Sequence, residues 1–391
     1  MLPVLINHND DLRRLQEEGY QIEVSGGYLV IHHIPYVNSH RHILYGKLVC
    51  PLTVNAGKTM RPQNHVIQFC GEYPCNADGT PILQIQHTSG NQQLTPEIVT
   101  NHSFSNKPAA GYADYYEKVS TYATIIASQA KSIDPTVTER TFVKMEGAAE
   151  DSVFQYPDTN AIRANIGIIN RKLAGQKLAI VGLGGTGGYV LDLVAKAPAS
   201  EIHLFDGDVF LQHNAFRAPG APSIAQLSAA VPKVVYFKQM YENMHKYIFA
   251  HPHRILEDNL DSLAAFDFVF LCIDSNAARA YIIKYLLANG IPFVDCGIGL
   301  EVVEDQLIGA VRITAGTASK ADHLPHRVPL RDAEDDLYTT NIQIADLNML
   351  NAFLAVHKWK KMSGFYQDLI QEHNAIFTIN TAQLDATDAT A

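Results

Sequence analysis

LAIVGLGGTGGYVLDLVAKAPASEIHLFDGD, residues 178–208, places a glycine-rich turn between two apolar runs. The apolar run before the glycines predicts a β-strand, and the glycines would open a helix that leads to a second strand. Without side chains, Gly182, Gly184 and Gly187 permit a tight turn whose N–H groups approach a phosphate at the positive end of the helix. The stretch therefore predicts a nucleotide-binding βαβ unit, and the rest of the chain must decide the nucleotide.

From Lys177 onward, strand-like runs alternate with helical patterns. Helices are expected at about 186–197, 234–247 and 277–289, with the apolar runs EIHLFD, FVFLCI and PFVDCG as strands between and after them. Such alternation predicts an α/β fold with a Rossmann-like, mostly parallel sheet and helices on both faces. Apolar residues at helical spacing and closing lysines predict one more helix over 341–361.

The first part of the chain, residues 1–150, has a different pattern. Short apolar runs at 27–34, 47–54 and 65–72 are separated by Gly, Pro and Asn, which favour turns. Apolar residues at helical spacing follow at 112–133. We predict a smaller, β-rich or mixed N-terminal domain.

The length of 391 residues suits two domains. The polar stretch EGAAEDSVFQYPDTN at 146–160 is predicted to be a linker. We therefore assign residues 155–391 to the nucleotide-binding domain.

Composition narrows the class of protein. With 47% hydrophobic and 18% charged residues, and apolar runs no longer than FDFVFLCI, no membrane span is expected. The N-terminus lacks the pattern of a signal peptide and the five cysteines have no paired spacing, so a reducing cytoplasm is the expected compartment. The net charge of −10 without basic clusters argues against nucleic acid as a partner.

Polar residues after the glycine turn suit a triphosphate. Asp206 ends the next strand, where an acid accepts hydrogen bonds from ribose hydroxyls. Asn214 and Arg217 are three residues apart, so a turn or short helix presents both on one face. Lys233 would begin a helix, and Asp274 would follow a buried strand at the edge where open α/β sheets bind ligands and where a carboxylate can hold Mg²⁺.

This ordered set of motifs resembles the ThiF and MoeB family, the bacterial relatives of ubiquitin-activating enzymes, over residues 160–380. The resemblance implies that ATP and Mg²⁺ occupy the site. It assigns ribose binding to Asp206, the N-x-x-R element to Asn214 and Arg217, and the metal to Asp274. The matching family positions are Gly182, Gly184, Gly185, Gly187, Asp206, Asn214, Arg217, Lys233 and Asp274.

The resemblance also implies a reaction. The C-terminal glycine carboxylate of a ubiquitin-like or sulfur-carrier protein would attack the α-phosphate of ATP, giving an acyl-adenylate and pyrophosphate. Arg217 and Lys233 would offset the charge of the triphosphate, and Asn214 would orient it. No general base is needed, because a carboxylate is already a nucleophile.

The family resemblance extends to partners. Family members pair as dimers and borrow an arginine from the partner subunit, for which Arg163 is the best match and Arg171 its rival. A homodimer is therefore expected. Residues 1–150 resemble an uncharacterised domain associated with ThiF-type proteins, and we expect that domain to recognise the protein substrate or a conjugating enzyme.

Two departures from the family pattern stand out. The usual Asp-Asn pair is Asp274-Ser275-Asn276 here, so either Asn276 replaces the missing neighbour or the adenine pocket differs. No Cys-x-x-Cys pair exists, so the structural zinc of many relatives is not expected. Cys296, expected at a strand end that faces the active edge, is the one candidate for a thioester; the alternative is a small buried residue.

Other functions remain open at the level of sequence. A dehydrogenase can begin with the same glycine turn, and an ATP-dependent dehydratase of a small molecule or modified nucleoside would share the ATP motifs. A catalytically silent scaffold would keep the fold without turnover. Such a scaffold would not need Asp206, Arg217, Lys233 and Asp274 together, which favours the adenylating enzyme.

Overall fold

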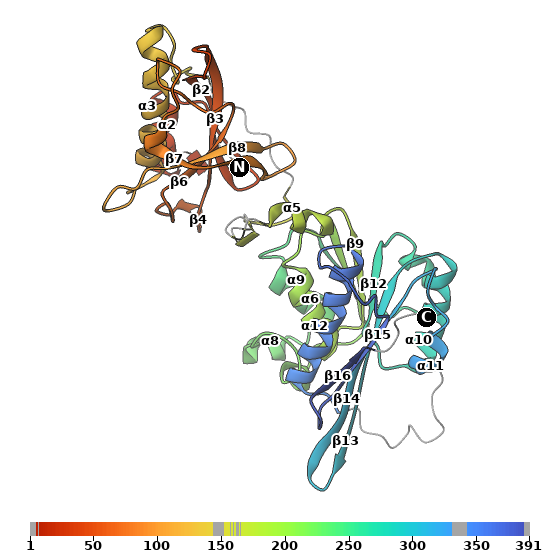
Figure 1. The fold of residues 1–391 in the computed structure, drawn as a ribbon. Helices are drawn as coiled ribbons and strands as arrows, with labels where there is room; N and C mark the ends of the chain where they lie inside the picture. Colours follow the sequence, from red (N-terminus) through yellow and green to blue (C-terminus); the bar gives the residue numbers. More distant parts are fainter. Residues whose placement is uncertain are drawn as a thin grey trace. The chain divides into compact units, whose positions relative to one another are not determined.

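The computed structural model describes residues 5–6, 8–143, 152–156, 158, 160–161, 164, 166–330 and 342–386 (Figure 1). The chain divides into two compact units. The first comprises residues 1–152 and 156–169, and the second comprises residues 153–155 and 170–391. Each unit has a hydrophobic core of its own.

The first unit is built on a six-stranded antiparallel sheet in the order β1-β2-β3-β6-β8-β7. Helix α3 (Tyr115–Ile133) begins where Asp114 accepts a hydrogen bond from the Glu117 N–H at 2.7 Å, as an N-cap does. Apolar residues of α3 and of α2 (Asp10–Glu17) pack with the sheet in one core. This architecture confirms the predicted β-rich, mixed domain. The six strands of the sheet are β1 (Ile22–Ser25), β2 (Tyr28–Val37), β3 (Ile43–Pro51), β6 (Val66–Cys70), β7 (Gln86–Gln93) and β8 (Val99–Ser105). The short strands β4 (Val54–Asn55) and β5 (Lys58–Thr59) form a separate two-stranded sheet.

The second unit is built on an eight-stranded sheet in the order β11-β10-β9-β12-β13-β14-β15-β16. The first five of these strands are parallel, as predicted, and the remaining pairs are antiparallel. Strands β9 to β12 are β9 (Lys177–Val181), β10 (Glu201–Phe205), β11 (Ile248–His251) and β12 (Phe268–Leu271). The others are β13 (Phe293–Val303), β14 (Gln306–Gly316), β15 (Asn374–Thr378) and β16 (Gln383–Ala386).

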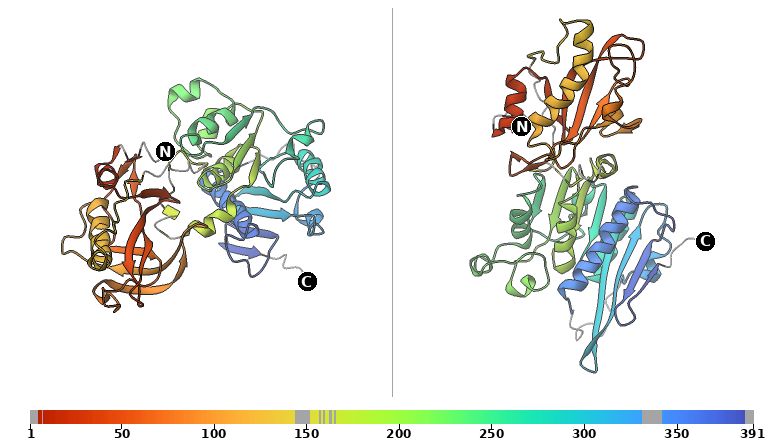
Figure 2. Two further views of the ribbon diagram at one scale, coloured as in Figure 1. Left: turned by 90° about the horizontal axis from the view of Figure 1, so that it is seen from above. Right: turned by 60° about the vertical axis from the view of Figure 1, so that its left-hand side comes forward.

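The long hairpin of β13 and β14 differs from the short strand that PFVDCG predicts. β13 continues to Val303, turns through Glu304 and Asp305, and returns as β14, so that the hairpin projects past its neighbours (Figures 1 and 2). Glu304 and Asp305 have positive φ angles of 49° and 59°, which suit a tight two-residue hairpin turn.

Helices cover both faces of this sheet (Figure 1). α6 (Gly185–Val194), α9 (Lys233–Tyr241) and α12 (Ala345–Met362) share one core with the sheet, and α10 (Asn276–Ala288) and α11 (Leu324–Arg327) share another. Shorter helices are α5 (Gly167–Asn170), α7 (Gln212–Ala215) and α8 (Ile224–Ser228). Among the described helices, none has both the length and the apolar character needed to cross a membrane.

Candidate nucleotide-binding site

The candidate site lies at the carboxyl ends of three neighbouring parallel strands. β10, β9 and β12 are adjacent in the sheet, and Gly182, Asp206 and Asp274 come just after them in the chain. β10 lies on one side of β9 and β12 on the other, so the strand order reverses at β9. Open α/β sheets bind ligands at such a reversal.

Close backbone contacts require glycine at two positions of this turn. Gly182 has a φ of +90°, and a Cβ there would stand 2.5 Å from the Cys272 carbonyl oxygen. At Gly187 a Cβ would stand 1.9 Å from the Gly182 carbonyl oxygen. A Cβ at Gly184 would make only an ordinary contact, 3.9 Å from Gln343 Oε1. The turn is therefore least crowded at the N-terminus of α6, where the helix dipole and the N–H groups of the first turn favour a phosphate.

Asp206 organises this turn. Its Oδ2 accepts a hydrogen bond from the Leu183 N–H at 2.7 Å, and its Oδ1 accepts one from the Asp208 N–H at 2.8 Å. Each carboxylate oxygen has a second lone pair. Asp206 can therefore keep its place beside the turn and still accept a hydrogen bond from a ribose hydroxyl.

Asp208, which the sequence analysis did not select, holds two cations beside the turn. Lys233 Nζ lies 2.8 Å from Asp208 Oδ2 and 3.6 Å from Asp206 Oδ1, and Arg254 Nη2 lies 2.7 Å from Asp208 Oδ1. Lys233 and then Arg254 lower the pKa of Asp208 to about 2. Gly207 makes room for this arrangement, since a Cβ there would stand 3.0 Å from Arg254 Cγ. In the sequence, the pattern Asp-Gly-Asp at 206–208 could have pointed to Asp208 as a second acidic residue beside the turn.

Asn214 and Arg217 occupy the loop that includes α7. Asn214 Oδ1 accepts a hydrogen bond from the Leu211 N–H at 2.8 Å, and the Arg217 N–H donates to the Asn214 carbonyl at 3.1 Å. Within the part of the chain that the structure describes, Asn214 Nδ2 and Arg217 Nε are buried without a hydrogen-bond partner. Buried donors without acceptors are costly. Both are N–H groups, which suit the oxygens of a phosphate.

Asn348 joins this loop to the glycine turn, and the sequence analysis missed it. Its Nδ2 donates to the Arg217 carbonyl at 3.1 Å, and its Oδ1 accepts from Thr186 Oγ1 at 3.0 Å. A Cβ at Gly185 would stand 1.9 Å from Asn348 Nδ2 and 2.7 Å from the Arg217 carbonyl oxygen. The absent side chain of Gly185 therefore allows α6, α12 and the Arg217 loop to meet.

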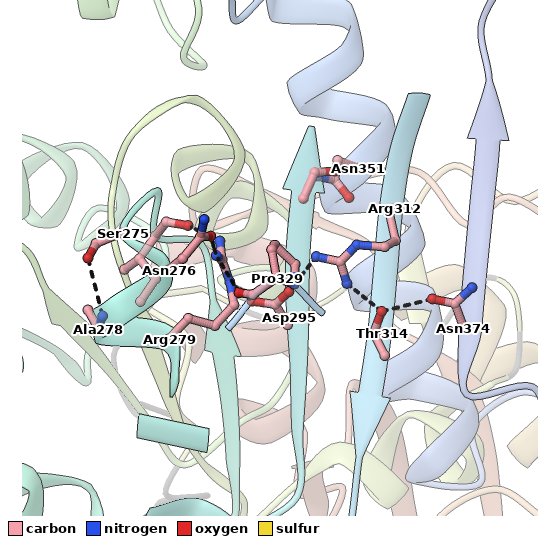
Figure 3. Close-up of polar contacts among 12 residues, drawn as sticks. Ser275, Asn276, Ala278, Arg279, Asp295, Arg312, Thr314, Pro329, Asn351 and Asn374 are labelled. Atoms are coloured by element: carbon pink, nitrogen blue, oxygen red, sulfur yellow. Dashed lines mark hydrogen bonds and ion pairs between the residues drawn. The ribbon is translucent and has the colours of Figure 1, made fainter. Parts of the chain in front are cut away.

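Asp274 lies exposed in the loop between β12 and α10. Ser275 caps the first turn of that helix. Arg279 donates to Asn276 Oδ1 and, at 2.6 Å, to the Ile273 carbonyl; Figure 3 shows Arg279 beside Asn276. The buried guanidinium of Arg279 therefore holds the loop that carries Asp274 in place.

The residues present fit Mg²⁺ only together with a nucleotide. Asp274 is the carboxylate that would hold the ion. In the described ranges, no group of three His, Cys, Asp or Glu side chains forms a metal site by itself. Mg²⁺ is commonly held by one or two carboxylates, water and phosphates rather than by a protein cage. A single exposed carboxylate beside the glycine turn matches that pattern.

The placement of Cys296 differs from the expected one. It lies inside β13 rather than at a strand end, because the strand continues into the hairpin. Its side chain is 5% exposed and packs in the core beneath α12 instead of facing the active edge. The neighbouring Cys296 thiol and burial raise the pKa of Cys272. The thioester role stays a prediction, as does the role of Arg163, which lies outside the described residues.

Comparison with family models agrees with the sequence motifs. Residues 161–311 match the ThiF family, and residues 10–159 match "Domain of unknown function (DUF6791)". The chain therefore carries a ThiF family domain after an N-terminal domain of unknown function, which confirms the resemblance. The match of residues 161–311 to the ThiF family supports ATP-dependent, adenylation-type chemistry. No curated protein matches the chain.

Several solved structures are similar to part of this chain. Escherichia coli MccB with succinimide is 17% identical, with a TM-score of 0.45 over 57% of this chain and 66% of MccB. E. coli MccB with ATP is 17% identical, with a TM-score of 0.46 over 58% of this chain and 69% of that one. E. coli tRNA N6-threonylcarbamoyladenosine dehydratase, TcdA, is 18% identical, with a TM-score of 0.39 over 52% of this chain and 92% of TcdA. The chain thus spans just under two thirds of the first of these.

Proposed function

We propose that this protein uses ATP and Mg²⁺ to adenylate the C-terminal glycine carboxylate of a ubiquitin-like or sulfur-carrier protein and releases pyrophosphate. The observation that carries the proposal is the pair of unpartnered N–H donors, Asn214 Nδ2 and Arg217 Nε. They belong to the loop whose backbone lies against the glycine turn. Two donors without acceptors beside a helix N-terminus fit a bound triphosphate.

Each side chain has a defined task in this reaction. Asn214 and Arg217 bind and orient the phosphates, and Lys233 turns from Asp208 toward the charge that develops as pyrophosphate leaves. Asp206 holds the turn and accepts the ribose hydroxyls. Asp274 would hold Mg²⁺, which neutralises phosphate charge as a Lewis acid. The carboxylate of the protein substrate is the nucleophile, so catalysis consists of positioning and charge neutralisation.

Partners belong to the same proposal. The protein acts as a homodimer in which Arg163 of each subunit completes the site of the other, and the DUF6791 domain recognises the protein substrate or a conjugating enzyme. An ATP-dependent dehydratase of a small molecule or modified nucleoside would use the same phosphate contacts. The two functions differ in what accepts the adenylate, so the substrate requirement separates them.

The test is ATP–pyrophosphate exchange with purified protein, Mg²⁺ and candidate ubiquitin-like proteins that end in glycine. Exchange should require the modifier and be lost in Arg217→Ala and Asp274→Ala. Lys284→Ala and Asp258→Ala remove exposed charges elsewhere and should retain exchange, which makes them the matched controls. ATP binding without exchange with any glycine-ended protein would refute the proposal and favour the dehydratase or the scaffold.

A further inference from the structure

Arg254, in the loop after β11, is a basic side chain that the reaction above does not use. Its Nη2 lies 2.7 Å from Asp208 Oδ1, while Lys233 Nζ lies 2.8 Å from Asp208 Oδ2. One carboxylate therefore holds two cations, one on each oxygen. The exposed fraction of the side chain is 70% for Arg254 and 8% for Lys233. Arg254 thus lies on the solvent side of the carboxylate and Lys233 on its buried side.

The loop that carries Arg254 is held over the end of β10. The Arg254 carbonyl accepts a hydrogen bond from Asn259 Nδ2 at 2.9 Å, and the Ile255 carbonyl accepts one from the Tyr281 hydroxyl at 3.0 Å. A Cβ at Gly207 would stand 3.0 Å from Arg254 Cγ. The position of the guanidinium is therefore set by the hydrogen bonds of the loop and by the absent side chain of Gly207.

The guanidinium lies among the carboxylates of the nucleotide site. Asp208 raises the pKa of Arg254 most, and the charges of Asp206 and Asp274 raise it further. Asp206 Oδ1 also lies 3.6 Å from Lys233 Nζ. These five side chains carry three negative charges and two positive ones. If Lys233 turns away from Asp208, Arg254 remains as a cation that pairs with that carboxylate.

Lys233 can leave the Asp208 carboxylate without any movement of the backbone. The Lys233 N–H donates to the Asp208 carbonyl at 2.9 Å, and α9 begins at Lys233. The ion pair itself involves only the two side chains. A lysine has a flexible stem and a compact ammonium group that reorients freely. Lys233 can therefore exchange the carboxylate for a phosphate while its helix stays in place.

The charge that Lys233 leaves behind sets the cost of this exchange. Asp208 is ionised at neutral pH, because Lys233 and then Arg254 lower its pKa to about 2. An ionised carboxylate retains Lys233 more strongly when it has fewer other cations. The guanidinium of Arg254 is a planar fork that can bind both oxygens of a carboxylate. When Lys233 leaves, Arg254 can take the second oxygen as well as the first.

We propose that Arg254 is a positioning residue that releases Lys233 from Asp208 for the phosphates of ATP. The inference rests on the proposed function, in which Lys233 offsets the charge that develops as pyrophosphate leaves. Arg254 acts through Asp208, by keeping that carboxylate paired while Lys233 is turned away. Because the charge that Lys233 offsets develops only in the transition state, Arg254 should affect kcat and not the affinity for ATP.

ATP–pyrophosphate exchange with a glycine-ended modifier gives kcat and the KM for ATP separately. Arg254→Gln should lower kcat about fivefold, which is the value of one partly exposed ion pair, and leave the KM unchanged. Arg254→Lys keeps the charge without the fork and should have an intermediate kcat. Lys196→Gln breaks an exposed ion pair with Asp192, 2.7 Å long, at the C-terminal end of α6 and should change neither constant. A raised KM with an unchanged kcat in Arg254→Gln would overturn the proposal, because Arg254 would then bind the nucleotide itself.

A double substitution separates this role from a purely structural one. Asp208→Asn removes the carboxylate that competes for Lys233, so Arg254 should no longer matter in its presence. The double variant Arg254→Gln with Asp208→Asn should therefore match Asp208→Asn alone and exceed Arg254→Gln alone in kcat. A double variant that is no faster than Arg254→Gln would overturn the proposal.

A labelling reaction follows the movement of Lys233 without any protein substrate. The probe is ATP whose γ-phosphate is joined to a carboxylic acid as an acyl phosphate. A lysine amine that reaches the phosphates attacks the acyl carbonyl, forms an amide and releases ATP. Mass spectrometry at saturating probe should show Lys233 labelled about fivefold more slowly in Arg254→Gln than in the wild type. The double variant should be labelled as fast as Asp208→Asn.

The two readouts separate this inference from the function on which it rests. Labelling of Lys233 that depends on Arg254, without exchange, would support the inference and refute the adenylation. Exchange with equal labelling of Lys233 in the wild type and in Arg254→Gln would support adenylation and refute the role of Arg254. Neither exchange nor labelling of Lys233 would overturn both.

Discussion

Asn348→Ala should weaken both the fold and the nucleotide site. Asn348 is fully buried on α12 and makes one hydrogen bond to the Arg217 carbonyl and one with Thr186. A buried partner left without a hydrogen bond costs about 1–3 kcal/mol, and the Thr186 hydroxyl can rotate to another acceptor. We therefore expect a loss of about 2 kcal/mol, which lowers the Tm of a domain this size by about 4–8 °C. Because the Arg217 loop is released, the Kd for ATP should rise about tenfold.

Asn351→Ala is the matched control. Asn351 lies one turn along the same helix and is equally buried, but its Nδ2 donates to the Gly297 carbonyl, at 3.1 Å. We expect a similar stability loss, because one buried carbonyl is left unpaired in each case, and an unchanged Kd for ATP. Thermal unfolding gives the Tm, and calorimetric titration well below it gives the Kd. Equal effects of the two substitutions on ATP affinity, or none from Asn348→Ala, would refute the role assigned to Asn348.

Three further substitutions test separate parts of the site. Gly184→Ala adds a methyl group whose nearest neighbour is Gln343 Oε1 at 3.9 Å, so ATP binding should fall at an unchanged Tm. Gly182→Ala should lower the Tm through its clash with the Cys272 carbonyl, and equal Tm values would contradict this difference. Asp208→Asn removes a carboxylate whose pKa is lowered to about 2, so its ion pairs stabilise the fold above about pH 4 and stop doing so as the pH falls toward 2. The Tm difference from wild type should shrink over that range, and a constant difference would be evidence against the ion pairs. Asp295→Asn leaves Arg279 and Arg312, whose guanidiniums lie 2.7 Å and 2.6 Å from the buried carboxylate, without a counter-ion. The free energy of unfolding measured in urea should fall by about 3–5 kcal/mol, and a loss below about 1 kcal/mol would show that these ion pairs do not stabilise the fold.

The parallel half of the sheet could be predicted because its signals are local. The run before Gly182 is apolar, the glycines open a helix, and the next apolar run ends at Asp206, so strand, turn and helix follow from a short window. The hairpin of β13 and β14 has no such signal. Its turn residues are Glu304 and Asp305 rather than the Asn-Gly or Asp-Gly pair that marks a tight hairpin, and Gly297 and Gly299 interrupt the apolar pattern of β13.

The candidate site was predictable where residues follow strand ends, and less so where residues meet from distant parts of the chain. Asp206, Asn214, Lys233 and Asp274 stand at element boundaries, which spacing reveals. Asn348 is 131 residues from the carbonyl that it binds, and only tertiary packing brings the two together. The partners of Asp295 are likewise separated along the chain and meet only in the folded sheet.

The central claim is that this site transfers the adenylyl group of ATP to a carboxylate. The most direct test follows ATP labelled at the α-phosphate or at the γ-phosphate in the presence of Mg²⁺ and a glycine-ended ubiquitin-like protein. The account predicts that the α-label appears on the modifier and then in AMP, while the γ-label appears in pyrophosphate. Release of ADP and phosphate, with no α-label on the modifier, would contradict it.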